Sequence, residues 1–260
     1  MRQVTLSDGA TIAYHDIGAG PPLLLMHGFT GTARSHLGGL IDALSADHRV
    51  LAPDLRGYGA SRPPARDFPP DFYRRDAADM AELLDMIGAA PTTVLGFSDG
   101  AESAILLGAM RPDLVRAVVA WGVSGVISAQ MAAAAQAWLP AASWAERRPA
   151  WRAEIIATQG EDQFAPQVEG WAAAAQAIYE AGGNICYEEA AAVTCPVLLL
   201  NGDREVNNLP EDFFRLGARL PNGRTVIVTG SGHSIQDDQP AVLLAHIREF
   251  LAEVEDRGSS

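Results

Sequence analysis

A serine with glycines two residues away on either side stands between an apolar run and a helical stretch. The segment reads Gly96-Phe97-Ser98-Asp99-Gly100, with the apolar residues 93–95 before it and an apolar helical pattern over 101–107 after it. This is the G-x-S-x-G pattern of a nucleophile elbow, a sharp strand-to-helix turn that projects the serine hydroxyl from a sheet edge. The same pattern also occurs in ordinary glycine-rich turns, so the rest of the chain must supply the partners that a nucleophile needs.

A serine nucleophile needs a general base, and His233 suits that role best. It lies in Gly230-Ser231-Gly232-His233-Ser234, directly after the last apolar run, where a loop delivers its side chain to the carboxyl edge of a sheet. Taken alone, a loop histidine is more often a surface residue, but its position downstream of an elbow favours catalysis. The other candidates lie in a strand, helices or helix ends that we expect to be remote from such a position: His15, His36, His48 and His246.

The acid that orients the base has two candidates in one turn. The apolar run 197–200 leads into Asn201-Gly202-Asp203-Arg204-Glu205, and both acidic residues follow the glycine. We favour Glu205, three residues beyond the glycine, with Asp203 and its shorter side chain as the rival. A third interpretation is that Asp203 only stabilises the turn. Either acid gives the chain order serine, acid, histidine.

Two backbone N–H groups are expected to hold the oxyanion of the reaction. The sequence His27-Gly28-Phe29 follows the apolar run 23–26, and a turn there aims the N–H of Phe29 at the reacting oxygen. The N–H of Asp99, next to the serine, is the second donor. We expect His27 to brace the loop rather than to transfer protons.

The elements that must position these residues alternate along the chain in a β/α rhythm. Continuous apolar runs, which strands buried on both faces require, occur at 23–26 and 50–53. Further strands are expected at 94–95, 115–121, 197–200 and 225–228. An alternating run at 11–14 predicts an early antiparallel strand, and a final helix is expected from 240 to about 253. This order predicts an α/β fold with a mostly parallel sheet flanked by helices.

Residues 122–193 interrupt that rhythm with alanine-rich helical segments. We expect a core formed by residues 1–121 and 194–254, a helical cap over 122–193, and a disordered tail over 255–260. Four of the five tryptophans lie in the cap. Packing between helices is the expected role of most of them, and the alternative is that some line a pocket under the cap.

Composition limits the partners and the compartment. The 260-residue chain carries a formal net charge of −13, without a basic stripe, so neither nucleic acid nor a membrane surface is an expected partner. Two cysteines in no metal-binding spacing, and an N-terminus without a signal-peptide pattern, predict a cytoplasmic protein without disulfides. We expect a small-molecule substrate and a monomer or small homo-oligomer.

Together the elbow, the His-Gly-Phe loop, the acid turn and the late histidine loop resemble the α/β-hydrolase superfamily over nearly the whole chain. Residues 54–61, Asp-Leu-Arg-Gly-Tyr-Gly-Ala-Ser, are also typical of it. This resemblance implies an eight-stranded, mostly parallel sheet with the helical cap inserted after the sixth strand. It further implies catalytic Ser98, Glu205 and His233, no metal and no organic cofactor.

A narrower resemblance is to the valacyclovir hydrolase (biphenyl hydrolase-like) family, through 57–69, the elbow, Trp121-Gly122, 183–186 and Cys195-Pro196. That family hydrolyses α-amino acid esters, and the resemblance implies that Asp99 binds the substrate ammonium group. The alternative role of Asp99 is to stabilise the positive end of the following helix. Glu205 departs from the family, where an aspartate is expected, and the cap matches weakly.

These observations predict a serine hydrolase of small carboxylic esters, preferably α-amino acid esters, that works through an acyl-enzyme. Two alternatives stay open. One is an amide, aminoacyl-peptide or C–C bond hydrolase with the same triad. The other is a ligand-binding protein that keeps the fold but turns over slowly.

Overall fold

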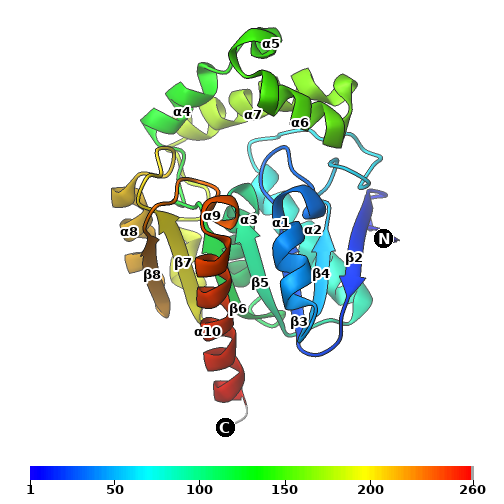
Figure 1. Ribbon diagram of the computed structural model, residues 1–260, viewed down its shortest axis with the longest axis vertical. Helices are drawn as coiled ribbons and strands as arrows, with labels where there is room; N and C mark the ends of the chain where they lie inside the picture. The colour runs from blue at the N-terminus through cyan, green and yellow to red at the C-terminus, as the bar shows by residue number, and fades with distance from the viewer. Residues whose placement is uncertain (259–260) are drawn as a thin grey trace.

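One eight-stranded sheet forms the centre of the molecule in the computed structural model, which describes residues 1–258 (Figure 1). The strands lie in the order β1-β2-β4-β3-β5-β6-β7-β8. β2 pairs antiparallel with both β1 and β4, and the other neighbours pair parallel, which confirms the mostly parallel sheet. The strands are β1 (Arg2–Thr5), β2 (Thr11–Ile17), β3 (Pro22–Met26), β4 (Arg49–Pro53), β5 (Thr92–Phe97), β6 (Val115–Trp121), β7 (Val197–Gly202) and β8 (Gly223–Val228).

The central strands are buried on both faces, which explains their unbroken apolar sequences. β5 and β7 are buried at every residue. In the parallel register Met26 lies opposite Gly96, and Phe97 lies opposite Trp121. The loops that follow β3, β5, β6 and β7 therefore all emerge at the same, carboxyl edge of the sheet.

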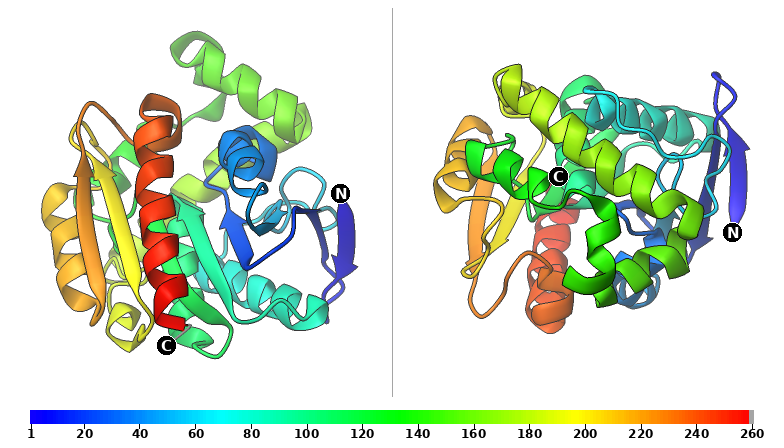
Figure 2. Two further views of the ribbon diagram at one scale, coloured as in Figure 1. Left: turned by 60° about the horizontal axis from the view of Figure 1, so that its bottom comes forward. Right: turned by 90° about the horizontal axis from the view of Figure 1, so that it is seen from above.

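Helices cover both faces of the sheet (Figure 2). α1 (Ala33–Leu44) and α10 (Pro240–Gly258) pack on one face. α2 (Phe72–Ile87), α3 (Asp99–Met110) and α8 (Pro210–Arg219) pack on the other. Throughout residues 1–258, no helix is long and apolar enough to cross a membrane.

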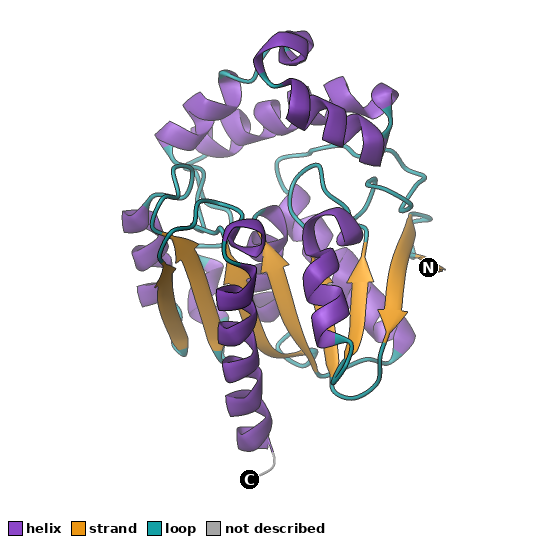
Figure 3. Cartoon of the chain, viewed as in Figure 1, coloured by secondary structure: helices purple, strands orange, loops and turns teal. Residues whose placement is uncertain are grey.

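A group of helices between β6 and β7 lies over the carboxyl edge of the sheet (Figure 3). This arrangement confirms the insertion after the sixth strand. The helices are α4 (Ala129–Gln136), α5 (Trp144–Arg147), α6 (Pro149–Gln159) and α7 (Glu161–Glu180), with short 3₁₀ segments η1 (Ala141–Ser143) and η2 (Glu189–Ala192). We refer to α4–α7 as the cap.

The C-terminal helix is longer than the sequence led us to expect. After the short α9 (Ile235–Asp238), α10 continues to Gly258, so the expectation of an end near residue 253 and a tail from 255 was wrong for 255–258. The buried Val254 extends the apolar face of the helix, and Glu255 accepts a hydrogen bond from His48 Nε2 at 3.1 Å. Residues 259 and 260 lie outside the described part of the chain.

Candidate active site

Ser98 occupies a strained turn between β5 and α3. Its φ of 55° lies in the left-handed region, which residues other than glycine rarely adopt. The two flanking glycines fit into close contacts: a Cβ on Gly96 would lie 2.4 Å from the carbonyl oxygen of Gly100, and one on Gly100 would lie 2.3 Å from that of Met26. The elbow geometry therefore depends on glycine at both positions.

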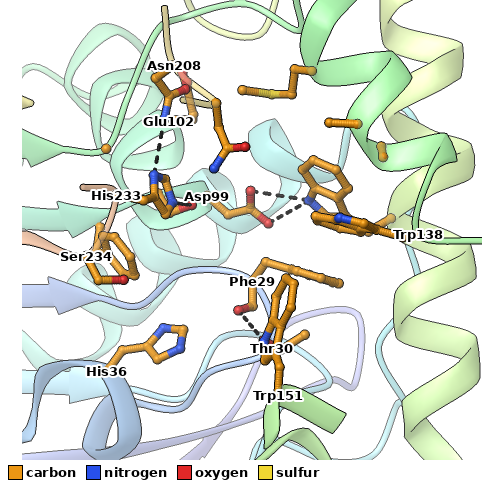
Figure 4. Close-up of a pocket in the computed structure, with 18 of the residues that line it drawn as sticks. Phe29, Thr30, His36, Asp99, Glu102, Trp138, Trp151, Asn208, His233 and Ser234 are labelled. Carbon is orange, nitrogen blue, oxygen red and sulfur yellow. Dashed lines mark hydrogen bonds between the residues drawn. The ribbon is translucent and has the colours of Figure 1, made fainter. Parts of the chain in front are cut away.

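The elbow, the acid turn and the histidine loop converge at the carboxyl edge. His233 Nε2 lies 3.0 Å from Ser98 Oγ, and His233 Nδ1 lies 2.5 Å from Glu205 Oε2. Figure 4 shows His233 beside Asn208, whose Nδ2 is 3.4 Å from Nδ1 of the ring. A hydroxyl, an imidazole and a carboxylate linked in this order can deprotonate the serine.

Glu205, rather than Asp203, is the carboxylate that meets the histidine. Asp203 is exposed and accepts a hydrogen bond from the N–H of Gly230 at 2.8 Å, which joins the acid turn to the loop after β8. The Arg204 N–H binds the Ser231 carbonyl at 2.9 Å and strengthens the same connection. One side-chain and one backbone contact thus hold the two loops in the register that brings Glu205 to His233.

Glu205 is buried, and its surroundings favour the ionised form. Burial acts to raise the pKa of Glu205, but the hydrogen bond and charge of His233 outweigh it, helped by the N–H of Asn207 at 2.7 Å. The pKa of Glu205 is therefore below its ordinary value. A carboxylate ionised in this position keeps the proton of the neutral imidazole on Nδ1 and leaves Nε2 free to accept the serine proton.

Both segments that carry the expected oxyanion donors, Phe29 and Asp99, adjoin the serine. Asp99 is the first residue of α3, where an N–H has no acceptor within the helix. The loop that carries Phe29 lies against the elbow, since a Cβ on Gly28 would be 2.9 Å from Ser98 Cβ. His27 is buried and braces this loop as expected, because its ring binds the Gly28 carbonyl at 2.8 Å and the Leu55 N–H at 2.9 Å.

The side chain of Asp99 is buried under the cap. Its Oδ1 accepts a hydrogen bond from the hydroxyl of Tyr73 on α2 at 3.0 Å, and its Oδ2 accepts one from Nε1 of Trp171 on α7 at 3.0 Å. Burial raises the pKa of Asp99 to about 6, against the opposing effects of the Tyr73 hydrogen bond and the Arg66 charge. The carboxylate is thus ionised at neutral pH in a place where a cation would stabilise it.

Ser98, Asp99 and His233 line a cavity of about 450 Å³. It is lined by Ser98 and His233, by aromatic side chains, and by four acidic residues, and none of the described residues that line it is lysine or arginine. The acidic residues are Asp99, Glu102, Glu154 and Asp237. A cavity with this lining favours a cationic or neutral ligand over an anionic one.

The cap tryptophans pack between helices as expected, and most of them also line this cavity, which was the alternative. Trp138, Trp151 and Trp171 line it, while Trp144 is fully buried between cap helices. They serve both purposes because the cap covers the carboxyl edge of the sheet, so residues between its helices also reach the cavity.

His36 also lines the cavity, although the sequence placed it far from the site. It lies on α1, close to Gly31 of the loop after β3 (Figure 4). Burial, with smaller effects of His27 and His233, lowers the pKa of His36 to about 3, so the ring is neutral. The close approach of α1 to that loop is a tertiary contact that no local pattern indicates.

Glu102 lies one turn of α3 beyond Asp99 and joins the core to both ends of the cap insertion. Its Oε1 accepts the N–H groups of Ser124 at 3.1 Å and Gly125 at 3.0 Å, and its Oε2 accepts the Cys186 thiol at 3.0 Å. Burial raises the pKa of Glu102 to about 7. Nothing in the local sequence distinguishes this glutamate from an exposed helix residue.

Comparison with known proteins places the chain among hydrolases. The alpha/beta hydrolase family matches residues 23–246. The chain is 32% identical to human serine hydrolase BPHL over 228 residues, which cover 84% of this chain and 77% of that protein. It is 26% identical to 2-(acetamidomethylene)succinate hydrolase from Mesorhizobium japonicum over 261 residues, 93% of this chain and 91% of that protein. A thermophilic esterase from Thermogutta terrifontis shares the fold, with a TM-score of 0.75 at 23% identity over 98% of this chain and 99% of the other.

Proposed function

The chain belongs to the alpha/beta hydrolase family, and from this we propose that it is a serine hydrolase of small carboxylic esters, preferably α-amino acid esters. One observation carries the proposal: Ser98 contacts His233, His233 contacts Glu205, and a buried carboxylate, Asp99, stands next to the nucleophile. The similarity to serine hydrolase BPHL supports the same class of reaction.

In the proposed reaction, His233 Nε2 takes the proton of Ser98 as Oγ attacks the ester carbonyl carbon. The N–H groups of Phe29 and Asp99 stabilise the tetrahedral oxyanion, and the imidazolium of His233 is stabilised by Glu205. His233 then gives its proton to the departing alcohol, which leaves an acyl-enzyme on Ser98. A water molecule, deprotonated by His233, attacks the acyl carbon and releases the acid.

Asp99 is proposed to bind the α-ammonium group of the substrate. The ammonium of an α-amino acid ester is two bonds from the scissile carbonyl carbon, and Asp99 follows the nucleophile directly in the chain. A charge-assisted hydrogen bond at that distance fixes the carbonyl in front of Ser98 Oγ. The raised pKa of Asp99 adds to the effect, since a carboxylate that is costly to ionise in the empty site gains from a bound cation.

Replacement of Asp99 by asparagine tests the ammonium role. The variant should lose about 10²-fold or more in kcat/KM for an alanine ester, because a buried charge pair is removed, and much less for the propionate ester of the same alcohol. An equal loss on both esters would contradict the role.

Labelling of Ser98 by a fluorophosphonate, with Ser98→Ala as the control, tests the nucleophile separately. A folded wild-type protein that does not react would favour a binding function.

A further inference from the structure

Three aromatic side chains form a cluster at the Asp99 end of the cavity. The ring centroids of Phe29 and Trp138 are 5.7 Å apart, those of Trp138 and Trp171 are 5.0 Å apart, and those of Phe29 and Trp171 are 5.4 Å apart. All three rings line the cavity, and Figure 4 shows Asp99, Phe29 and Trp138 directed toward the same space. We call Phe29, Trp138 and Trp171 the aromatic cluster.

The carboxylate of Asp99 already uses much of its hydrogen-bonding capacity within the protein. The Tyr73 hydroxyl binds Oδ1, and the Trp171 N–H lies within reach of both oxygens, at 3.3 and 3.0 Å. A primary ammonium group carries three N–H donors, all of which need acceptors when water is excluded. Asp99 has few acceptor positions left to offer them.

The aromatic cluster, α4 and Glu102 do not replace the missing acceptors. Aromatic rings attract a cation through the negative face of the π system but accept N–H hydrogen bonds only weakly. The residues that α4 adds to the lining are apolar: Met131, Ala134 and Ala135. The carboxylate of Glu102 already binds two backbone N–H groups and a thiol. These walls thus provide negative charge and aromatic surface with few free acceptors, and further acceptors of the lining come from α6, α9 and the loop after β7.

Building on the proposed ester hydrolysis, we propose that this subsite is selective for N-methylated and quaternary ammonium groups, so that the preferred acyl groups are those of N-methylated α-amino acids and betaines. Methyl groups remove the N–H donors that lack acceptors and spread the positive charge over a surface that contacts aromatic rings. A carboxylate combined with an aromatic cluster satisfies both requirements of such a cation. A cavity of about 450 Å³ has room for the added methyl groups.

A series of ethyl esters tests this selectivity on the wild-type protein near pH 7. The acyl groups are glycyl, N-methylglycyl, N,N-dimethylglycyl and N,N,N-trimethylglycyl, with 3,3-dimethylbutanoyl as the uncharged shape match of the last. Each kcat/KM is divided by the rate constant of hydroxide-catalysed hydrolysis of the same ester, which removes intrinsic reactivity. We expect the normalised value to rise roughly 2- to 30-fold from glycyl to trimethylglycyl, and the uncharged ester to be poorer than both.

The outcomes separate this inference from the proposed function. Hydrolysis of the glycyl ester with a steady fall on methylation would overturn the methyl selectivity and leave aminoacyl ester hydrolysis intact. Equal rates for the uncharged and the glycyl esters would instead contradict the ammonium role of Asp99. Hydrolysis of none of the esters would contradict the proposed function itself.

Substitutions at Trp138 test the aromatic contribution. Trp138→Leu keeps an apolar side chain without a π face, and Trp138→Phe keeps the face, so the two form a matched pair. The ratio of trimethylglycyl to glycyl kcat/KM should fall about threefold or more in the leucine variant and stay close to wild type in the phenylalanine variant. Equal ratios in all three proteins would overturn the role of the cluster. If the leucine variant does not fold, competitive inhibition of the wild type replaces this test. Tetramethylammonium should then inhibit ester hydrolysis at a lower concentration than ammonium does.

Discussion

Glu205 and Asp203 differ in what they contact, and this difference predicts opposite effects of neutralising them. Glu205→Gln replaces the carboxylate that binds His233 Nδ1 and should lower kcat on the order of 10³- to 10⁴-fold, because the amide does not hold the reactive tautomer or stabilise the imidazolium. Asp203→Asn keeps an oxygen for the Gly230 N–H and should change kcat by less than about threefold. Steady-state hydrolysis of one ester by both variants measures this. A larger loss in the Asp203 variant would contradict the assignment of the acid.

The raised pKa of Asp99 predicts how substrate preference changes with pH. Because its folded-state pKa is about 6, the negative charge is present above that pH and is lost as the pH falls through 6. The α-amino group of the substrate loses its own charge above about pH 8. The ratio of kcat/KM for an alanine ester to that for a propionate ester should therefore be largest between about pH 6 and 8.

The ratio isolates Asp99 because pH effects on the steps common to both esters cancel in it. In Asp99→Asn the ratio should lose its acidic limb and stay near its low-pH value. A ratio that does not vary between pH 5 and 7 in the wild type would show that Asp99 does not act on the substrate charge.

At this scale the sequence predicted which of these side chains meet at the sheet edge, but not their surroundings. Ser98, His233 and Glu205 are recognisable because each follows a strand in a local pattern, and parallel strands bring their carboxyl ends to one edge. Both Glu205 and Asp203 contact the loop after β8, and the choice between them depended on which carboxylate reaches the His233 ring. The Tyr73 and Trp171 partners of Asp99 come from α2 and α7, 26 and 72 residues away, so only the packed structure shows them.

Helix α3 has two buried acids in its first turn, Asp99 and Glu102, and the second of them predicts a pH-dependent stability. The folded-state pKa of Glu102 is about 7, above the 4.5 of an exposed glutamate, so between these values the folded protein holds a proton that the unfolded chain releases. The free energy of unfolding must therefore decrease as the pH rises through this window, by on the order of 1–3 kcal/mol for this one group.

Glu102→Gln tests this pH dependence of stability, because the amide oxygen of the glutamine can still accept the Ser124 and Gly125 N–H groups. The variant should gain stability relative to the wild type as the pH rises from 5 to 8, as measured by urea unfolding at each pH. Glu146→Gln, at an exposed site on α5, serves as the control and should show no such trend. A difference between Glu102→Gln and wild type that is constant with pH would contradict the raised pKa.

The strands were easier to predict than the helix boundaries for a physical reason. A strand buried on both faces needs an unbroken apolar run, so β3, β5 and β7 are evident in the sequence. The end of α10 depends on packing of Val254 against the core, and the cap helices are rich in alanine, which favours helix without marking a buried face. Their orientation over the cavity, and with it the role of the tryptophans, follows from the whole fold.

In the whole molecule, the site lies between two layers, the core and the cap, which contact each other only in the folded protein. The core supplies Ser98, Glu205 and His233, and the cap supplies Trp171, which binds Asp99 directly. The aromatic cluster likewise combines Phe29 of the core with two cap residues. In the proposed function, catalysis therefore belongs to the sheet edge, and the helices above it contribute to substrate recognition.

The charge of the whole molecule predicts a salt dependence that distinguishes cationic from neutral substrates. With a net charge of −13 and a cavity lined by four acidic residues, the protein attracts a cationic ester at low ionic strength. Salt screens this attraction, because the Debye length falls from about 30 Å at 0.01 M salt to about 8 Å at 0.15 M. Between these salt concentrations kcat/KM for a trimethylglycyl ester should fall roughly 3- to 10-fold, while that for the 3,3-dimethylbutanoyl ester should change little. Glu154→Gln, on the exposed part of the lining, should weaken the dependence, and Asp47→Asn, beyond the opposite edge of the sheet, should weaken it less. The same salt dependence for both esters would mean that the acidic lining does not contribute to substrate capture.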